Sequence, residues 1–306
     1  MADRDLPQGV RVFERGWLSS NNILMLGSTS TALIDSGYST HARQTLDLVE
    51  GALEQRPLDL LFNTHLHSDH CGGNAALQTA YPELRTLIPP GQADSVSPWD
   101  PIALTYIPTG QICPEFQFNG LLRSGDEIQL ADRTWQIHAA PGHDPHSVIF
   151  LEPQSRTLIS ADALWENGFG VVFPELDGAS AFAEVAATLD VIEKLGPRIV
   201  IPGHGAVFYY RDEVLVSARQ RLNAFVRNPS RHAHHAAKVL LKFKLLEQQQ
   251  LPFANLVEWA GGASYFEQIR KNFFASVPIN AWVEQLTDEL VSSSVARRSG
   301  ELISNA

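Results

Sequence analysis

Short apolar runs separated by Gly, Pro and Asp dominate the first two thirds of the chain. Runs of this length, bounded by turn residues, are typical of strands. The pattern predicts eight strands: Val10 to Phe13, Asn22 to Leu26, Thr31 to Asp35, Leu60 to Asn63, Thr134 to His138, Ser147 to Leu151, Thr157 to Ser160 and Arg198 to Ile201. Helical spacing of apolar residues predicts helices over His41 to Glu54 and Ala179 to Leu195. This mixture indicates a two-layer sheet core with helices outside it.

After Gly205 the pattern changes to helix-rich sequence with few strands. It predicts helices over Glu213 to Arg227, Ala233 to Gln249 and Asn280 to Ser293, a short helix over Phe253 to Trp259, and a hairpin over Val295 to Ile303. Three helices followed by a hairpin are the order of a winged-helix module of roughly 70 to 80 residues. We therefore expect a sheet-containing domain at 1–210, a connecting helix at 211–230 and a winged-helix-like domain at 231–306.

Charge follows the same division of the chain. The 306 residues carry a net charge of −11, which argues against general binding to a phosphate backbone. Residues 1–205 hold 11 Lys+Arg against 25 Asp+Glu, whereas residues 206–306 hold 12 against 9. The net charge is therefore −14 for residues 1–205 and +3 for residues 206–306, and this change supports a domain boundary near 206–230. With 44% hydrophobic and 19% charged residues, the composition is that of a globular protein and excludes a disordered or collagen-like chain.

The cysteine count and the start of the chain indicate a compartment. Only Cys71 and Cys113 occur, so neither a disulfide framework nor a four-cysteine zinc site can form. No apolar run approaches the ~18 to 20 residues that span a bilayer. The first ten residues, MADRDLPQGV, lack the basic and apolar regions of a signal peptide. We expect a soluble, cytoplasmic protein with no membrane partner.

A cluster of histidines directly follows the apolar run LLFN. His65, His67, Asp69 and His70 fall within six residues, in the segment THLHSDHCGG. A single histidine in a loop is usually a surface or packing residue. Four such polar groups at the end of a buried strand are costly to bury unless a cation organises them. The spacing therefore favours a metal site.

Further ligands are needed, because a six-residue loop cannot surround an ion. His143 follows the run TWQIHAA, Asp162 follows TLIS and His204 follows RIVI. Each lies shortly beyond the end of a predicted strand, and loops at matching strand ends meet at one edge of a sheet sandwich. Glycine precedes both His143 and His204, which permits a sharp turn and a close approach of the backbone.

These motifs resemble those of the metallo-β-lactamase fold superfamily of hydrolases, over roughly residues 8 to 210. The resemblance implies an α/β fold, a four-layer αββα sandwich with a dinuclear metal site at one edge. It implies that His65, His67 and His143 hold the first ion and that Asp69, His70 and His204 hold the second, with Asp162 bridging them. It also implies that Asp35, after the third predicted strand, supports the histidine-rich loop from behind. The alternative for Asp35 is a plain turn residue.

The ligand set contains imidazole nitrogens and carboxylate oxygens without a thiolate. Two divalent ions are expected; zinc is favoured, and iron or manganese would also suit. Cys71 is interpreted as a packing residue. Two cations that share a water would lower its pKa toward about 7 and provide a hydroxide for attack. Asp69 is the candidate to orient that hydroxide and to pass its proton to the leaving group.

Weaker signals surround these motifs. Trp165 and Phe169, downstream of Asp162, are candidates for substrate contact, with a simple hydrophobic lid as the alternative. The segment Asp144-Pro145-His146-Ser147 departs from the family's usual Thr-x-Gly-Ser, and His146 is a further candidate for substrate contact, or an ordinary loop residue. The histidines at 232, 234 and 235 are interpreted as a solvated helix start.

The functions that remain open share the metal site. We favour a metal-dependent hydrolase of esters, thioesters, lactones or related small acyl substrates. A single-stranded RNA endonuclease or phosphodiesterase is one alternative, because the helical C-terminal part resembles the β-lactamase-like endoribonuclease subgroup. A tail charge of only +3 supports a nucleic-acid partner weakly. An iron-dependent sulfur or redox protein of the same fold is another alternative, and a homo-oligomer stays open.

Overall fold

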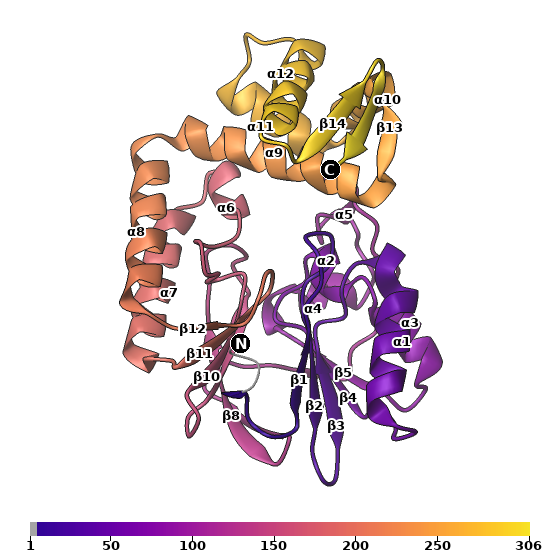
Figure 1. The fold of residues 1–306 in the computed structure, drawn as a ribbon, viewed down its shortest axis with the longest axis vertical. Helices are drawn as coiled ribbons and strands as arrows, with labels where there is room; N and C mark the ends of the chain where they lie inside the picture. The colour runs from indigo at the N-terminus through magenta and orange to yellow at the C-terminus, as the bar shows by residue number, and fades with distance from the viewer. Residues whose placement is uncertain (1–4) are drawn as a thin grey trace. The chain divides into compact units, whose positions relative to one another are not determined.

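The computed structural model describes residues 5–306 and divides them into two compact units (Figure 1). Unit 1 extends to Asp100 and continues from Cys113 to Ala224, and unit 2 comprises Pro101–Ile112 and Phe225–Ala306. The segment Pro101–Ile112 therefore packs with the C-terminal part although it interrupts unit 1. The domain boundaries expected from the sequence, at 210 and 230, stay a prediction, and residues 1–4 lie outside the described residues.

Unit 1 contains two six-stranded sheets. The first has the order β1 (Val10–Phe13), β2 (Asn22–Leu26), β3 (Thr31–Ile34), β4 (Leu60–Phe62), β5 (Arg85–Ile88) and β6 (Gly120–Leu121). The second has the order β12 (Phe208–Tyr209), β11 (Ile199–Pro202), β10 (Thr157–Ala161), β9 (Val148–Glu152), β8 (Arg133–Ala139) and β7 (Glu127–Leu130). β3 to β6 pair in parallel, as do β10 and β11, and the other neighbours are antiparallel.

Alternation along the strands explains how the layers pack. Ile23 and Met25 on β2 belong to the core cluster between the sheets, which also holds Trp135 and Phe150 of the second sheet. Leu24, between them in sequence, faces the opposite way and packs with residues of the covering helices. A strand buried on both faces in this way lies between a sheet and a helix layer.

Helices cover the outer faces of both sheets. α1 (Ala42–Leu53) and α3 (Asn74–Ala80) supply Val49, Leu53 and Leu77 to the cluster on the first sheet. α7 (Ala181–Leu195) and α8 (Asp212–Arg227) lie outside the second sheet in Figure 1. The expected αββα fold class is confirmed.

Shorter elements of unit 1 connect these layers. They are η2 (Ser39–His41), α2 (Ser68–Cys71), η3 (Pro90–Gln92), α4 (Ala93–Val96) and α6 (Phe173–Leu176). All eight predicted strands are found with ends shifted by at most one residue. β5, β6, β7 and β12 were not predicted, because each is only two to four residues long and so short a run gives a weak periodic signal.

Unit 2 combines helices with a small sheet. Its elements are α5 (Tyr106–Thr109), α9 (Pro229–Gln248), β13 (Gln250–Pro252), α10 (Phe253–Gly262), α11 (Ser264–Phe273), α12 (Ile279–Ser292), β14 (Ala296–Ser299) and β15 (Leu302–Asn305). The sheet order is β13, β15, β14, with all pairs antiparallel. The predicted helices and the hairpin are present, and α5, β13 and α11 are additions. Within residues 5–306, no helix is both long and apolar enough to cross a bilayer.

The histidines near the start of α9 differ from the expectation of a solvated helix start. His232 is 1% exposed, and its ring lies 4.9 Å from that of Phe225. His234 is half-buried and lies against Glu289 of α12, with Nε2 2.9 Å from Oε2. The expectation is therefore wrong for His232, which packs in the interior because the apolar face of α9 includes its position.

Glu289 offers a test of the packing of α12 on α9. Burial would raise its pKa, but hydrogen bonds from His234, Lys238 and Gln285 outweigh burial and lower the pKa to about 2. Because the folded pKa lies below the ordinary value, the ion pairs stabilise the fold above about pH 4.5, and this contribution declines as the pH falls toward 2. We expect Glu289→Gln to lower the free energy of unfolding at pH 7 by about 1 kcal/mol.

Urea unfolding at pH 7 and at pH 3 measures this effect. The difference in the free energy of unfolding between Glu289→Gln and wild type should be smaller at pH 3 than at pH 7. Glu258→Gln removes an exposed carboxylate from α10 of the same unit and serves as the control. An equal loss of stability for Glu289→Gln at both pH values would contradict the assignment.

Candidate metal centre

The predicted ligands lie just beyond the ends of four strands, most of them in loops and Asp69 and His70 in the short helix α2. The histidine-rich segment connects β4 of the first sheet to α2. His143 follows β8, Asp162 follows β10 and His204 follows β11, all in the second sheet. The structure gathers these side chains into two groups: His65, His67 and His143 in one, and Asp69, His70, Asp162 and His204 in the other. Within each group the potential ligand atoms lie within 4.8 Å of one another.

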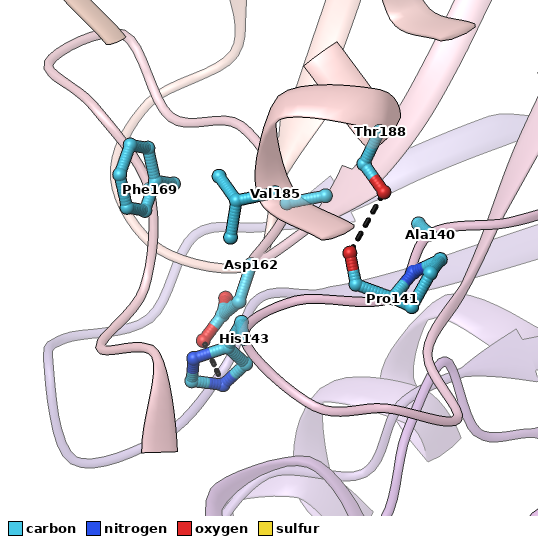
Figure 2. Close-up of a pocket in the computed structure, with 8 residues that line it drawn as sticks. Ala140, Pro141, His143, Asp162, Phe169, Val185 and Thr188 are labelled. Carbon is cyan, nitrogen blue, oxygen red and sulfur yellow. Dashed lines mark hydrogen bonds and ion pairs between the residues drawn. The ribbon is translucent and has the colours of Figure 1, made fainter. Parts of the chain in front are cut away.

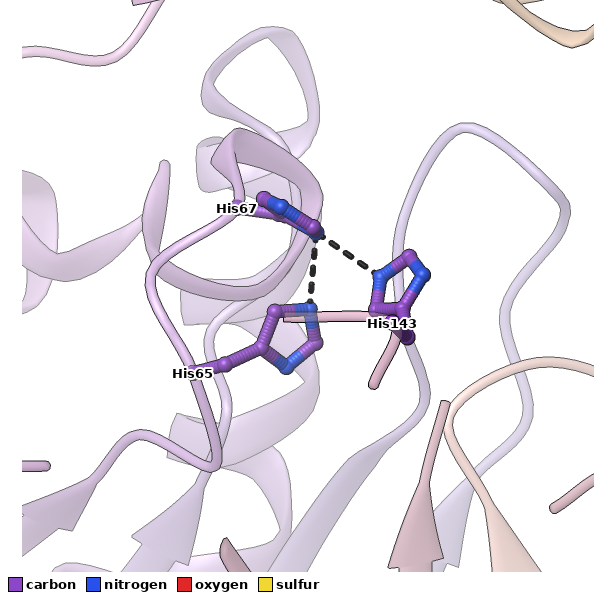
Figure 3. A group of neighbouring side chains, drawn as sticks. All are labelled: His65, His67 and His143. Atoms are coloured by element: carbon purple, nitrogen blue, oxygen red, sulfur yellow. Dashed lines mark hydrogen bonds between the residues drawn. The ribbon is translucent and has the colours of Figure 1, made fainter. Parts of the chain in front are cut away.

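The three-histidine group has one imidazole nitrogen at its centre (Figure 3). Nδ1 of His67 lies 3.1 Å from Nε2 of His65 and 2.8 Å from Nε2 of His143. The other nitrogen of His143, Nδ1, donates to the backbone oxygen of Val171. A neutral His143 therefore directs the lone pair of Nε2 toward the other two rings.

Burial keeps two of these imidazoles neutral. Burial, and then the neighbouring His70, His67 and His143, hold the pKa of His65 well below its ordinary value. Burial, and then His67, lower the pKa of His143 to about 4. Nitrogen lone pairs that face one another repel unless a proton or a cation lies between them, so this geometry fits a divalent ion that prefers imidazole ligands.

Asp162 connects the two groups through a single oxygen. Its Oδ2 lies 3.4 Å from Nε2 of His143, 3.6 Å from Nε2 of His70 and 3.8 Å from Nε2 of His204. Its Oδ1 accepts a hydrogen bond of 3.1 Å from Nε1 of Trp165. Trp165 thus fixes the carboxylate so that Oδ2 faces histidines of both groups.

The second group attracts positive charge. Oδ2 of Asp69 lies 3.1 Å from Nε2 of His204 and 3.9 Å from Nε2 of His70. Burial alone would lower the pKa of His70, but Asp35, Asp162 and Asp69 outweigh it and raise that pKa well above its ordinary value. Burial would raise the pKa of Asp162, but His204 and His70 hold it well below its ordinary value. The two carboxylates therefore stay ionised and favour a cation at this position.

A buried nitrogen without a partner tests the fit of a metal ion. Nε2 of His70 is buried and has no hydrogen-bond partner, while its Nδ1 lies 2.7 Å from Oδ2 of Asp35. A buried polar atom is expected to have a partner. Because Nε2 is directed toward Asp69 and Asp162, a cation ligated by all three would satisfy it. The donor set of nitrogen and oxygen atoms suits a divalent ion.

Asp35 lies directly behind the histidine-rich loop. Its Oδ1 accepts from the backbone N–H of Thr64, and its Oδ2 accepts from the Thr64 hydroxyl, both at 2.8 Å. Oδ2 also holds Nδ1 of His70. The side chain is 1% exposed and the backbone has a φ of 58°, a conformation that Asp and Asn tolerate better than most residues. One carboxylate thus fixes both the path of the loop and the orientation of a ring.

Asp35→Asn should weaken metal binding without removing a ligand. The amide keeps the shape and the left-handed backbone, but its NH₂ group cannot accept both hydrogen bonds that Oδ2 accepts. Loss of such a supporting contact typically costs about 10- to 100-fold in metal affinity. Competitive titration with a chromogenic chelator measures the affinity. Asp47→Asn, on the exposed face of α1, is the control and should match wild type. Equal affinities for Asp35→Asn and wild type would refute the supporting role.

Glycine is required where the backbone passes the ligands. A Cβ atom at Gly203 would lie 2.1 Å from Oδ1 of Asp162 and 3.0 Å from Cε1 of His70. Gly142, before His143, has a φ of 139°, and a Cβ there would lie 2.5 Å from a methyl group of Val185. Both glycines permit the close approach that was expected for the Pro-Gly-His segments.

Two tryptophans lie beside His204. The ring of Trp17 stacks on the imidazole with centroids 5.4 Å apart and planes 11° apart. Trp165 meets the same imidazole edge to face, at 5.7 Å. Trp165 is one of the predicted contact candidates, and sequence reasoning missed Trp17. No pattern in the sequence connects the loop before β2 with His204, which lies almost 190 residues further on.

Of the other predicted contact residues, Phe169 is buried and His146 is half-buried. Phe169 is 1% exposed and lines a small pocket beside His143 and Asp162, together with Ala140, Pro141, Ala163, Val185 and Thr188 (Figure 2). Thr188 closes one side of this pocket by donating to the backbone oxygen of Pro141. The ring of His146 packs against the backbone of Gly91, where a Cβ would lie 2.0 Å from Nδ1. Substrate contact by Phe169 or His146 stays a prediction.

The two cysteines of the chain lie next to each other. Cys71 is completely buried and donates to the backbone oxygen of His67 at 3.3 Å. Its Sγ lies 3.8 Å from Sγ of Cys113, and the two cysteines are not joined by a disulfide. These contacts are those of a packing residue, as expected for Cys71.

Known proteins are similar to this chain in sequence or in fold. A family model described as the metallo-beta-lactamase superfamily matches residues 15–204. A hydroxyacylglutathione hydrolase from Synechococcus sp. is 32% identical over 165 residues, which are 54% of this chain and 57% of that protein. An atrochrysone carboxyl ACP thioesterase from Aspergillus fumigatus is 26% identical over 191 residues, which are 62% of this chain and 52% of that protein.

The chain thus spans little more than half of the length of these curated relatives. Among solved structures, a beta-lactamase domain protein from Burkholderia ambifaria aligns with a TM-score of 0.58. It is 19% identical, and the alignment covers 98% of this chain and 93% of that chain. At this identity the likeness concerns the fold alone.

Proposed function

The chain belongs to the metallo-beta-lactamase superfamily, and on this premise we propose that it is a metal-dependent hydrolase of thioesters or closely related acyl compounds. The observation that carries the proposal is the carboxylate of Asp162, whose Oδ2 faces histidines of both ligand groups. The relatives named as a hydroxyacylglutathione hydrolase and an acyl-carrier-protein thioesterase support a thioester, because acylglutathione and acyl-carrier conjugates share that bond.

The ligand assignment follows from the two groups. His65, His67 and His143 would hold one ion, with Nδ1 of His67 and Nε2 of the other two as donors. Asp69, His70 and His204 would hold the second ion, and Asp162 would bridge both. Zinc is favoured for this mixture of nitrogen and oxygen donors, and iron or manganese also suits it.

A pair of divalent cations would polarise the acyl oxygen and lower the pKa of a bound water. The residues of the chain supply position and proton transfer. Asp69, with Oδ2 3.1 Å from Nε2 of His204, is 16% exposed at its side chain and therefore reaches the substrate side. It would orient the attacking water and pass a proton to the leaving thiolate. Asp35 and Trp165 would keep His70 and Asp162 in place during this step.

We also assign unit 2 to the winged-helix-like modules. The support is its order of α9, β13, three helices and the β14–β15 hairpin, with β13 beside β15 in one small sheet. A role for this unit in RNA binding receives little support, because residues 206–306 have a net charge of only +3. Thioester hydrolysis is therefore the function to test first.

A panel of substrates tests the proposal. Metal-loaded wild type should hydrolyse acyl thioesters faster than bis(4-nitrophenyl) phosphate or single-stranded RNA. His65→Ala should remove this activity, whereas His138→Ala, at a histidine of β8 outside both ligand groups, should keep it. Cleavage of RNA without thioester hydrolysis would overturn the proposed substrate class. Equal rates for wild type and His65→Ala would overturn the metal-dependent mechanism.

A further inference from the structure

Trp17 exposes a large apolar ring beside the metal centre. It lies in the loop between β1 and β2, and 56% of its surface is exposed. Most tryptophans bury their rings, because an indole gains much free energy on leaving water. One face of the ring is occupied by the imidazole of His204, and the exposure shows that the other face is open to solvent.

Contacts from two sides hold this ring in place. Trp165 packs against Trp17 edge to face, with centroids 5.2 Å apart and planes 69° apart. Trp165 is itself fixed by its hydrogen bond to Oδ1 of Asp162. Trp17 thus packs on Trp165, and Trp165 in turn donates a hydrogen bond to Asp162. These two contacts fix the position of the Trp17 ring relative to the carboxylate. A ring that only filled space on the surface would need no such support.

We propose that Trp17 determines substrate specificity: its open face packs against an apolar group of the substrate next to the scissile bond. The preferred substrates would then carry an aryl or long alkyl group rather than a methyl group at that position. This inference rests on the proposed function for the reaction itself, since the bond that is cleaved would lie at the ligands His204 and Asp162. Stacking on the indole supplies binding that a small acyl group cannot use.

Two substrate series determine whether Trp17 contacts the acyl group or the thiol group of the thioester. One series keeps the thiol constant and compares acetyl with phenylacetyl and octanoyl groups, and the other keeps the acyl group and varies the thiol in the same way. We expect wild type to prefer the larger group in one series. Trp17→Ala should lower this preference, measured as the ratio of kcat/KM values, about tenfold. Trp17→Phe, which retains an aromatic ring, should keep most of it.

Binding of analogues provides a readout that does not depend on hydrolysis. Thioethers in which a methylene group replaces the carbonyl cannot be cleaved, and isothermal titration calorimetry gives their Kd. Trp17→Ala should raise the Kd of the phenylethyl thioether about tenfold. Tyr209→Ala removes another exposed aromatic ring, paired with Ile199 at the end of β11 remote from His204, and should not change this Kd.

These measurements distinguish a failure of the proposed role of Trp17 from a failure of the proposed thioester hydrolysis. If wild type binds the large thioether more tightly than the small one, and Trp17→Ala removes the difference, the inference stands even if no thioester is hydrolysed. If wild type hydrolyses thioesters but Trp17→Ala alters neither the kcat/KM ratio nor the Kd, the inference is wrong and the proposed function is unaffected. Absence of any size preference in wild type, in both series, would also overturn it.

Discussion

Asp162→Asn is expected to lower kcat/KM for thioester hydrolysis about a thousandfold or more. The reason lies in the hydrogen bond from Nε1 of Trp165 to Oδ1. In the variant this donor selects the amide oxygen, so the NH₂ group takes the position of Oδ2. An NH₂ group bears no negative charge and has no lone pair for a cation, although the shape of the side chain is unchanged. Both ions would lose their shared ligand in a single substitution.

Steady-state kinetics together with the metal content of the purified protein measures this effect. Asp190→Asn removes an exposed carboxylate of α7 that pairs with Arg219 and should retain wild-type activity. Circular dichroism should show an intact fold for both variants, because Asn is isosteric with Asp. If Asp162→Asn retained two ions and more than a tenth of the activity, Asp162 would not be the bridging ligand.

Gly203→Ala is also expected to have a large effect, although it adds only one methyl group. The new Cβ would lie 2.1 Å from Oδ1 of Asp162, well inside van der Waals contact. The backbone of the Pro202-Gly203-His204 turn must then move away from the site, and His204 moves with it. A displacement of about 1 Å in such a site can cost about a hundredfold in rate, so we expect kcat/KM to fall at least that far.

The matched control is Gly16→Ala, in the same unit. A Cβ at Gly16 meets no atom within 4 Å, and its φ is not in the left-handed region. Both variants replace glycine by alanine, so a lower kcat/KM for Gly203→Ala than for Gly16→Ala would result from the lack of space at Gly203. Comparable activities of Gly203→Ala and Gly16→Ala would show that the turn can shift without disturbing the ligands.

The residues that could be predicted from the sequence are those with a local signal. The spacing of His65, His67, Asp69 and His70 requires no knowledge of the fold, since the four lie within six consecutive residues. The strand ends before His143, Asp162 and His204 are also local features. Because matching strand ends share one edge of a sheet sandwich, the sequence predicts that these three residues lie close to the histidine-rich segment. The two groups in the structure contain these seven side chains.

Features that depend on distant packing could not be predicted in this way. A role for Trp17 at the metal centre becomes visible only when the structure places its ring against His204. The burial of His232 depends on Phe225 and on the apolar face of α9. Pro101–Ile112 packs within unit 2, although its sequence position lies inside unit 1. In each case the determining contact joins segments that no short-range pattern relates.

The proposed mechanism requires that the seven side chains of the two groups hold two divalent cations. Equilibrium dialysis followed by elemental analysis tests it most directly. We expect two equivalents of a divalent metal per chain for wild type, and about one for His65→Ala and for His204→Ala, each of which removes a ligand of a different ion. Binding of one equivalent or less by wild type, or of two by both variants, would contradict it.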